Sequence, residues 1–483
     1  MPRSSLRGAR WSTGEHQKQF WFNTLDCSHL PEIALGLSFA VELSRRASSS
    51  SYWSLRSRAT GQDDGLVLPA IVWYQLALAS NTYAQRIGGD LRITRLRVTN
   101  FRNYHHLDLA LPPHLVIIQG GNAQGKTNLL EAVHVLATTK SHRTSDDRDL
   151  LHWLALEDSP PFARLLAEVD RARGGLKVDI LLRWEGKALT SGEATSAIPS
   201  PAGLVRKQIK VNDIARRAVD FVGQVNVVVF SAQDIELITG APALCRRYLD
   251  LVNSQIDHRY LRCLQRYNRV LLQRNHLLRL LQVHQAQPEQ LEFWDRELVE
   301  NGTYIMLQRQ HLVRRLDELS RRIHHDLSHQ AENLELVYLP SVGTKGESGT
   351  EVEARFQQAL RQSVDREVSQ GMTLVGPHRD HLQFRVNGMD TSKYGSRGQQ
   401  QTVVLALKLA EADYMYAQVG DAPILLLDDV FSELDRTRRQ HLLESIVSFQ
   451  QVLITAVDLD YFEPSFLSQA SRLQVREGSI EAA

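Results

Sequence analysis

Alternating apolar and polar residues predict β-strands in two separate stretches of the chain. Over residues 91–98 the side chains alternate as in a half-buried strand. The first stretch is expected to hold strands at 91–98, 107–111, 115–120, 163–170, 176–184 and 224–230. The second is expected to hold strands at 372–376, 382–388, 423–429 and 451–457. Residues 186–203 are rich in Gly, Ser, Thr and Pro, which is typical of a loop.

Between these stretches, from about residue 242 to residue 330, the apolar period is that of a helix. Gln287, Pro288 and Glu289 predict a turn that divides the region into two helices, which we expect to form a hairpin. One stripe consists of Leu264, Tyr267, Leu271, Leu278 and Leu281, and the other of Trp294, Leu298, Ile305, Leu312, Leu316, Leu319 and Ile323. The predicted fold class is therefore α/β, with a helical insert that splits the sheet-containing lobe.

The composition is that of an ordinary globular protein. The chain has 483 residues, 43% hydrophobic and 23% charged, and a net charge of +1, so it is long enough for several structural units. Any contact with a strongly charged partner must then come from local patches of charge. Residues 1–88 differ, because Ser and Arg are frequent there and no helix or strand period is visible. We interpret them as an N-terminal extension without regular structure, or as residues upstream of the true start of translation.

The cysteine and apolar patterns predict a cytoplasmic location. Cys27, Cys245 and Cys263 show no metal-binding spacing, which indicates reduced thiols. The longest apolar stretch, residues 67–79, is too short to cross a bilayer. The first thirty residues lack the continuous apolar region of a secretory signal.

A phosphate-binding loop follows the strand expected at 115–120. The pattern G-x-x-x-x-G-K-T is complete and is followed by a segment of helical period, a context that a chance match in a glycine-rich turn would lack. Backbone N–H groups of such a loop point at phosphate oxygens of ATP. The residues expected to bind the nucleotide are Gly120, Gly121, Asn122, Ala123, Gln124, Gly125, Lys126 and Thr127. Lys126 supplies charge to the terminal phosphates, and the Thr127 hydroxyl is a candidate ligand of Mg²⁺.

Two acidic residues end the apolar strand expected at 423–429. Asp428 is predicted to hold Mg²⁺, directly or through water. Asp429 is predicted to orient or deprotonate the water that attacks ATP, so Asp429 and Lys126 are the candidate catalytic residues. The alternative for such a pair is a solvated strand end without a catalytic role.

A third motif, YGSRGQQQ at 394–401, precedes a segment expected to form an amphipathic helix. Ser396, Gly398 and Gln399 would offer a hydroxyl, free N–H groups and an amide to an anion at the start of that helix. In isolation the motif is a plain helix cap. Its place shortly before the acidic strand, and the long helical insert between Lys126 and Asp428, favour an ABC/SMC-like ATPase head over a compact nucleoside kinase.

From residue 91 to the C-terminus the chain resembles the RecF family of bacterial recombinational-repair and gap-repair ATPases. The segments that carry the resemblance are NFRNY at 100–104, GKTNLLEA at 125–132, LVGPHRD at 374–380, YGSRGQQ at 394–400 and LLLDDVFSELD at 425–435. The resemblance implies an ATPase lobe I at 89–240 and 366–483 and a helical lobe II at 241–365. The Walker A motif lies in the first part of lobe I, and the signature motif, Walker B and D-loop in the second.

The same resemblance implies the function and the partners. Two copies are expected to dimerise with ATP on gapped DNA and, with RecO and RecR, to promote RecA loading. Residues 396–400 would cap the γ-phosphate of ATP bound by the opposite subunit, and residues 432–435 would be the D-loop at the dimer interface. Hydrolysis is expected to be weak and DNA-dependent.

Two sites depart from the family pattern. Gln233 lies in a Ser-Ala-Gln-Asp sequence where the family more often has Ser-Pro-Glu-Asp, so it is a weak candidate for a nucleotide-sensing residue. Residues 455–458, Thr-Ala-Val-Asp, lie at the end of the last expected strand. Many ABC proteins carry a catalytic histidine at this place. The absence of that histidine is consistent with slow hydrolysis.

The helical insert contains many arginines and, over 259–322, no lysine. Arginines can bind phosphate oxygens in a bidentate manner, which would suit DNA recognition independent of base sequence, although a solvated helical face has the same composition. The arginines are Arg259, Arg262, Arg266, Arg269, Arg274, Arg279, Arg296, Arg309, Arg314, Arg315, Arg321 and Arg322.

Other P-loop functions remain as alternatives. The ATPase subunit of a transporter or an SMC-like defence protein would share the phosphate loop and the signature motif. A small-molecule kinase would need an acceptor pocket and no signature motif, so YGSRGQQ weighs against it.

Overall fold

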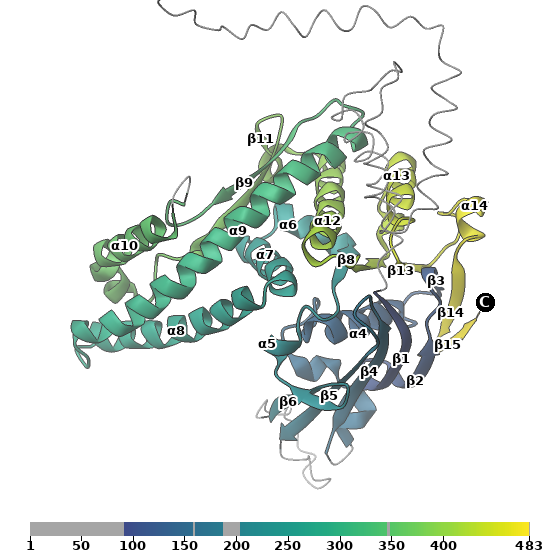
Figure 1. The fold of residues 1–483 in the computed structure, drawn as a ribbon, viewed down its shortest axis with the longest axis horizontal. Helices are drawn as coiled ribbons and strands as arrows, with labels where there is room; N and C mark the ends of the chain where they lie inside the picture. The colour runs from purple at the N-terminus through teal and green to yellow at the C-terminus, as the bar shows by residue number, and fades with distance from the viewer. Residues whose placement is uncertain (1–90, 158–159, 187–202, 345–347, 483) are drawn as a thin grey trace, which may run out of the picture. The chain divides into compact units, whose positions relative to one another are not determined.

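The computed structural model describes residues 91–157, 160–186, 203–344 and 348–482 (Figure 1). The extension expected at 1–88 and most of the loop expected at 186–203 lie outside these residues. Within the described ranges, no helix combines the length and the apolar character needed to cross a bilayer.

Sheet A is antiparallel, with the strand order β2–β1–β4–β5–β6–β7. Its strands are β1 (Arg92–Phe101), β2 (Tyr104–Ala110), β4 (Phe162–Asp170), β5 (Leu176–Gly186), β6 (Gly203–Val211) and β7 (Ile214–Arg216). Leu96 and Val98 of β1 are fully buried, whereas the alternate residues Arg95 and Arg97 face outward. This alternation confirms the predicted half-buried strand.

Sheet B has the strand order β15–β14–β3–β13–β12–β8, in which all neighbours except β15 and β14 run parallel. Its strands are β3 (His114–Gln119), β8 (Val227–Ser231), β12 (Ile424–Asp428), β13 (Gln451–Ala456), β14 (Ser471–Arg476) and β15 (Ser479–Ala482). Strands from both sides of the helical insert are thus neighbours, which confirms the predicted split lobe. Both faces of the sheet are covered: Val116 and Ile118 lie in one core, and Leu115 and Ile117 in another.

Helix α4 (Lys126–Thr138) lies between the two sheets and contacts strands of both. Leu129, Ala132, Val133 and Leu136 of this helix share one apolar core with the inner face of sheet A and one face of sheet B. This packing fixes the start of α4, and with it the end of the phosphate loop, at the carboxyl edge of sheet B.

The other face of sheet B packs against α7 (Pro242–Ile256), α12 (Arg397–Val419), α13 (Arg436–Ile446) and the C-terminal half of α9. The prediction that α12 is amphipathic is wrong, because this helix is buried on almost all sides. Its charged Lys408 and Glu411 are also buried, and they form an ion pair at 2.5 Å. The helix is surrounded because α9 covers the side that a two-layer fold would leave to solvent.

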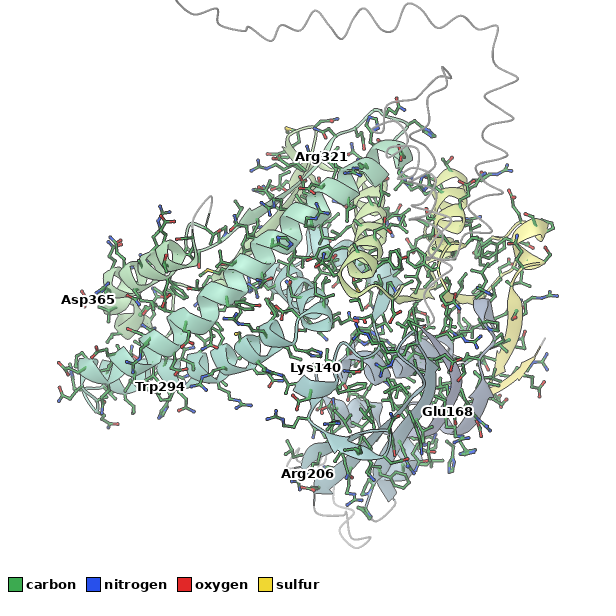
Figure 2. The ribbon with its side chains drawn as sticks, in the orientation of Figure 1. Lys140, Glu168, Arg206, Trp294, Arg321 and Asp365 are labelled. Atoms are coloured by element: carbon green, nitrogen blue, oxygen red, sulfur yellow. The ribbon has the colours of Figure 1, made fainter. Side chains whose placement is uncertain are left out.

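Helices α8 (His258–Gln282) and α9 (Leu291–Leu327) form the predicted hairpin, and the short 3₁₀ turn Pro288–Gln290 lies between them. In Figure 2, Trp294 near the hairpin tip and Arg321 lie towards opposite ends of α9. Every residue of the two predicted apolar stripes is buried or partly buried in one of the cores. Helix α10 (Gly349–Gln370) packs against both helices of the hairpin.

A third sheet has the order β11–β10–β9, with β9 (Leu334–Leu339), β10 (His381–Val386) and β11 (Met389–Asp390). Strand β10 matches the strand expected at 382–388. The strand expected at 372–376 is wrong, because this segment is irregular. Side chains rather than a neighbouring strand accept its backbone N–H groups: Asn275 accepts from Thr373 at 2.8 Å, and Glu367 accepts from Leu374 at 2.8 Å.

The remaining elements are short helices that connect these parts. They are η4 (Asp147–Leu150), η5 (Trp153–Glu157), α5 (Ala218–Phe221), η6 (Ala232–Ile235), α6 (Glu236–Thr239), η8 (Pro377–Arg379), α11 (Thr391–Tyr394), η9 (Val430–Ser432) and α14 (Pro464–Leu467). Since α7 and half of α9 share a core with sheet B, the helical segment and the ATPase lobe are joined by packing as well as by the chain. The division into 89–240, 241–365 and 366–483 stays a prediction.

Candidate nucleotide site

The phosphate loop connects the end of β3 to the first residue of α4. Two of its glycines are required by close packing. Gly125 has φ 113°, and a Cβ there would lie 2.4 Å from the Asn103 amide nitrogen. A Cβ on Gly120 would lie 2.7 Å from the Val475 carbonyl oxygen. Any side chain at these positions would therefore displace the loop.

Lys126 is the first residue of α4, and its side chain points back into the phosphate loop. Its Nζ donates to the carbonyl oxygens of Gly120 and Gly121, both at 2.8 Å, and the residue is 7% exposed. Burial lowers the pKa of Lys126, and the nearby carboxylates of Asp429 and Asp428 oppose this shift. The ammonium group is thus held where phosphate oxygens could replace the two carbonyls as acceptors.

Thr127 and Asp428 are brought together, as a magnesium site requires. The Thr127 hydroxyl donates to Asp428 Oδ1 at 2.9 Å, and the Thr455 hydroxyl donates to the same oxygen at 2.9 Å. A hydroxyl and a carboxylate beside a phosphate loop are oxygen ligands of the kind that Mg²⁺ prefers. The residues therefore fit the ion, and Thr127 and Asp428 would hold it beside the nucleotide phosphates.

Asp429 follows directly, in the left-handed backbone conformation with φ 51°. Its backbone N–H donates to the Thr455 hydroxyl at 2.9 Å, and its carbonyl accepts from the Ser432 hydroxyl at 2.8 Å. Partial burial raises the pKa of the Asp429 carboxyl, and the Lys126 ammonium opposes this shift. The turn thus directs Asp429 away from the strand axis and close to Lys126.

The predicted signature motif begins helix α12. Ser396 caps α12 in a reciprocal capping box: its hydroxyl accepts from Gln399 N–H at 3.2 Å, and the Gln399 side chain accepts from Ser396 N–H at 2.9 Å. The Gln399 amide also donates to Glu332 at 2.7 Å. Among the described residues, no hydrogen bond or ion pair joins Ser396, Gly398 or Gln399 to the phosphate loop.

The predicted D-loop lies beside the signature motif. Glu433 forms an ion pair with Arg397 at 2.9 Å, and its carbonyl accepts from the Gln401 side chain at 3.1 Å. Ser396 and Arg397 are exposed, so the two motifs together form one accessible surface. This arrangement leaves the signature motif free to meet a second molecule.

Several residues that support the loop were not predicted as site residues. The Asn103 amide donates to the Gln124 carbonyl at 3.1 Å, and the Tyr104 hydroxyl donates to the Gly125 carbonyl at 3.0 Å. Arg102 forms a bidentate pair with the fully buried Glu131 of α4, at 2.8 and 2.7 Å. The NFRNY segment was identified only as a family feature, and no spacing rule relates it to the loop.

The two departures from the family pattern lie close to the site. Ser231 and Asp234 form a capping box around the exposed Gln233. Thr455 is the last-but-one residue of β13 and pairs in register with Asp428. The register of two neighbouring parallel strands could have identified it as a support for both acidic residues.

The arginines of the helical insert divide into three groups. Arg274 and Arg309 are buried and bind carboxylates, so they are structural. Most of the others are paired or packed: Arg262, Arg266, Arg315 and Arg321 with carboxylates, Arg279 with a carbonyl, and Arg259 and Arg296 with aromatic rings. Arg269, Arg314 and Arg322 are exposed, and their side chains have no polar partner within the described ranges.

The two cysteines that the structure describes are free thiols, Cys245 buried and Cys263 partly exposed, and Cys27 lies outside the described residues. Across the described ranges, no group of three or more His, Cys, Asp or Glu side chains is arranged to hold a metal. The magnesium prediction thus rests on Thr127, Asp428 and the nucleotide phosphates.

Comparison with known proteins identifies the relatives of this chain. Residues 95–173 match a family model described as an AAA domain. The DNA replication and repair protein RecF of Herpetosiphon aurantiacus is 45% identical over 393 residues, which cover 80% of this chain and 99% of the relative. That of Chloroflexus aggregans is 41% identical over 399 residues, which cover 81% and 99%.

A solved structure described as the recombination mediator protein RecF-ATPrS in the RecFOR pathway is 29% identical, with a TM-score of 0.71 over 81% of this chain and 98% of that one. The fold is therefore that of an ABC/SMC-like P-loop ATPase head with a split nucleotide-binding lobe and a helical insert, as predicted.

Proposed function

Because the chain belongs to the RecF family of DNA replication and repair proteins, we propose that it is an ATP-dependent DNA-binding protein of recombinational and replication-gap repair. The observation that supports the proposal is that the predicted signature motif has no bond to the phosphate loop. Thr127 is bonded to Asp428 beside the loop, whereas the hydrogen bonds of Ser396 within the described residues are those of its own helix cap. Two subunits facing each other would complete both sites.

ATP would bind along the phosphate loop at residues 120–127, and Lys126 would pair with its terminal phosphates. Thr127 and Asp428 would hold Mg²⁺, which neutralises phosphate charge when bound. Asp429 would orient or deprotonate the attacking water. The Thr455 hydroxyl would keep both acidic residues in place, because it contacts each of them. Ser396, Gly398 and Gln399 of the facing subunit would cap the γ-phosphate.

Slow hydrolysis is expected, because residues 455–458 contain no histidine. ATP would act mainly by closing the dimer, and hydrolysis by opening it, with DNA increasing the rate. Arg269, Arg314 and Arg322 are the arginines of the insert best placed to bind DNA phosphates, because no carboxylate of the described residues neutralises them.

The proposed setting is the cytoplasm, where the dimer would bind gapped DNA and, with RecO and RecR, promote RecA loading. A solved RecF structure is described as belonging to the RecFOR pathway, which supports these partners. A transporter subunit, a defence protein or a small-molecule kinase is not proposed, because the relatives of this chain are repair proteins over nearly their whole length.

The proposal is tested by measuring the mass of the protein by light scattering with ATP or ADP, each with and without a gapped DNA duplex. A dimer is expected with ATP, and its amount should increase when gapped duplex is present. A monomer under all four conditions, or a dimer of equal amount with ADP, would contradict an ATP-gated clamp. Adding RecR and RecO then tests whether either protein changes the mass of the DNA-bound complex.

A further inference from the structure

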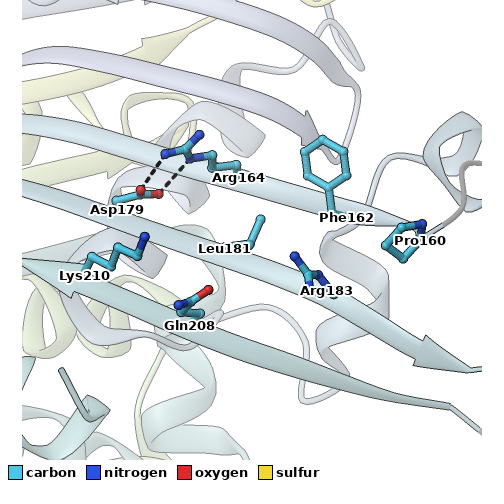
Figure 3. Close-up of a pocket in the computed structure, with 8 residues that line it drawn as sticks. All are labelled: Pro160, Phe162, Arg164, Asp179, Leu181, Arg183, Gln208 and Lys210. Carbon is cyan, nitrogen blue, oxygen red and sulfur yellow. Dashed lines mark hydrogen bonds and ion pairs between the residues drawn. The ribbon is translucent and has the colours of Figure 1, made fainter. Parts of the chain in front are cut away.

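An open pocket of about 770 Å³ lies on the outward face of sheet A, and the opposite face of the sheet packs against α4. Figure 3 shows the side chains of β4, β5 and β6 that line it. Phe162 and Leu181 are apolar and partly exposed. Three cations, Arg164, Arg183 and Lys210, and one carboxylate, Asp179, complete the main lining.

The charges in the pocket are not balanced. Arg164 donates to both carboxylate oxygens of Asp179, at 2.9 and 2.6 Å, so these two side chains neutralise each other. Arg183 and Lys210 form no ion pair or side-chain hydrogen bond with any described residue. Cations elsewhere on this face are paired: Arg95 and Arg97 with Asp108, Lys177 with Asp213, and Arg206 with Glu185. The unneutralised positive charge is therefore concentrated in the pocket.

Phe162 and Leu181, together with the unpaired cations Arg183 and Lys210, favour a ligand that has both an apolar group and negatively charged groups. Duplex DNA fits poorly, because its dense phosphate charge would also face Asp108, Asp179 and Glu168, which lie on the same face of the sheet. A peptide can place one apolar side chain on Phe162 and Leu181 and its carboxylates on Arg183 and Lys210 without reaching Asp108 or Glu168, and the Asp179 carboxylate of the lining is already bound by Arg164.

We propose that this pocket binds a short acidic segment of a partner protein. An apolar side chain of the segment rests on Phe162 and Leu181, and its carboxylates accept hydrogen bonds from Arg183 and Lys210. This surface shares no residue with the nucleotide site, so a negative result for the pocket would not contradict the proposed ATPase function.

The test measures binding of a fluorescein-labelled peptide, GSGDDFDDL, to the full-length protein by fluorescence anisotropy. Two matched peptides separate the contributions: GSGNNFNNL lacks the carboxylates, and GSGDDADDA lacks the apolar side chains. Labelled single-stranded and duplex oligonucleotides are measured in parallel. The variants are Arg183→Glu with Lys210→Glu, and the control is Arg95→Glu, which lies on β1 outside the pocket lining and is separated from β5 by β4.

The acidic peptide is expected to bind the wild type at least tenfold more tightly than either matched peptide. The double variant should lose at least tenfold in affinity, and Arg95→Glu should retain the wild-type affinity. ATP affinity and the thermal unfolding midpoint check that the variants are folded, and Arg183→Gln with Lys210→Gln repeats the test if the reversal variants do not fold. The proposal is overturned if the wild type does not bind the acidic peptide, if GSGNNFNNL binds equally well, or if the variants weaken only oligonucleotide binding, which would assign the surface to nucleic acid.

Discussion

At the scale of single residues, Lys126 provides the most direct test of the nucleotide site. Replacing it with Ala or Met removes the ammonium group that now donates to Gly120 and Gly121. We expect ATP affinity to fall by at least tenfold and ATP-dependent dimerisation to be lost, because no other lysine lies in the loop. Equilibrium binding of a fluorescent ATP analogue and light scattering measure both effects.

Lys140→Ala is the matched control for Lys126, because Lys140 is exposed just beyond the end of α4 (Figure 2). It should bind ATP as the wild type does. Tight ATP binding and a normal dimer mass in Lys126→Ala would show that the loop does not hold the phosphates.

Asp429 and its neighbour Asp428 should have separable roles. Asp429→Asn removes the carboxylate proposed to act on water but leaves Thr127 and Asp428 in contact. We expect ATP binding to be retained, phosphate release to slow by about 10²-fold or more, and the dimer to persist longer after ATP is added. Asp428→Asn should instead weaken magnesium-dependent binding. Turnover at the wild-type rate in Asp429→Asn would place the catalytic base elsewhere.

The loop, Thr127, Asp428 and Asp429 could be predicted because the motif spacing and the strand pattern place them at one sheet edge. Thr455 could have been identified from the register of β13 with β12, but Asn103 could not, since the loop atom that it binds becomes its neighbour only after folding. Asn103 lies in the turn between β1 and β2, and its side-chain amide donates to the carbonyl of Gln124, which is 21 positions later in the chain. Single-residue periodicity contains no information on such a contact.

At the scale of elements, the segment 372–380, which contains η8, should make the free energy of unfolding depend on pH. Burial lowers the pKa of His378 to about 4. In the neutral ring, Nε2–H donates to the Thr373 carbonyl at 3.1 Å and Nδ1 accepts from the Tyr267 hydroxyl at 2.6 Å, so the segment is tied to α8. An unfolded histidine has a pKa of about 6.5.

Because the pKa of His378 is lower in the folded state than in the unfolded state, acid should reduce the stability of the protein. Above about pH 6.5 both states are neutral and the contribution of His378 is fully present. As the pH falls from about 6.5 to about 4, only the unfolded state gains a proton, so stability is lost, by an amount on the order of 3 kcal/mol at most. Urea unfolding at pH 7.5 and pH 5 should show a smaller loss for His378→Asn than for the wild type. The exposed His276→Asn is the control, and an equal loss in all three proteins would contradict the prediction.

Elements with a clear period could be predicted, and those defined by tertiary contacts could not. The hairpin of α8 and α9 follows from its apolar stripes and its proline turn. Residues 372–376 read as a strand because they are apolar, but Asn275 and Glu367 satisfy their backbone in place of a partner strand. Helix α12 read as amphipathic because its polar positions, including Lys408 and Glu411, gave no sign that they would pair inside the core.

At the scale of the whole molecule, the signature motif tests whether the site is shared between two subunits. Ser396→Arg places a bulky cation on the surface formed with the D-loop. We expect the monomer to bind ATP with unchanged affinity, because within the described residues Ser396 forms hydrogen bonds with Gln399 of its own helix cap and none with the phosphate loop. ATP-dependent dimerisation and retention on gapped DNA should be lost. Ser348→Arg is the control, since Ser348 caps α10 in an equivalent capping box, and loss of a cap costs about 1 kcal/mol in either helix.

Mixing variants distinguishes a shared site from a site within one subunit. In a dimer of Ser396→Arg with Lys126→Ala, one composite site combines the intact phosphate loop of the first subunit with the intact signature motif of the second. Such a mixture should recover part of the dimerisation and DNA retention that each variant lacks alone, because one complete site can still close. The outcome depends on whether Ser396 acts on ATP of its own subunit or of the other, which apolar periodicity does not indicate. If ATP affinity of the Ser396→Arg monomer fell as far as that of Lys126→Ala, the motif would act within its own subunit, and the clamp mechanism would have to be abandoned.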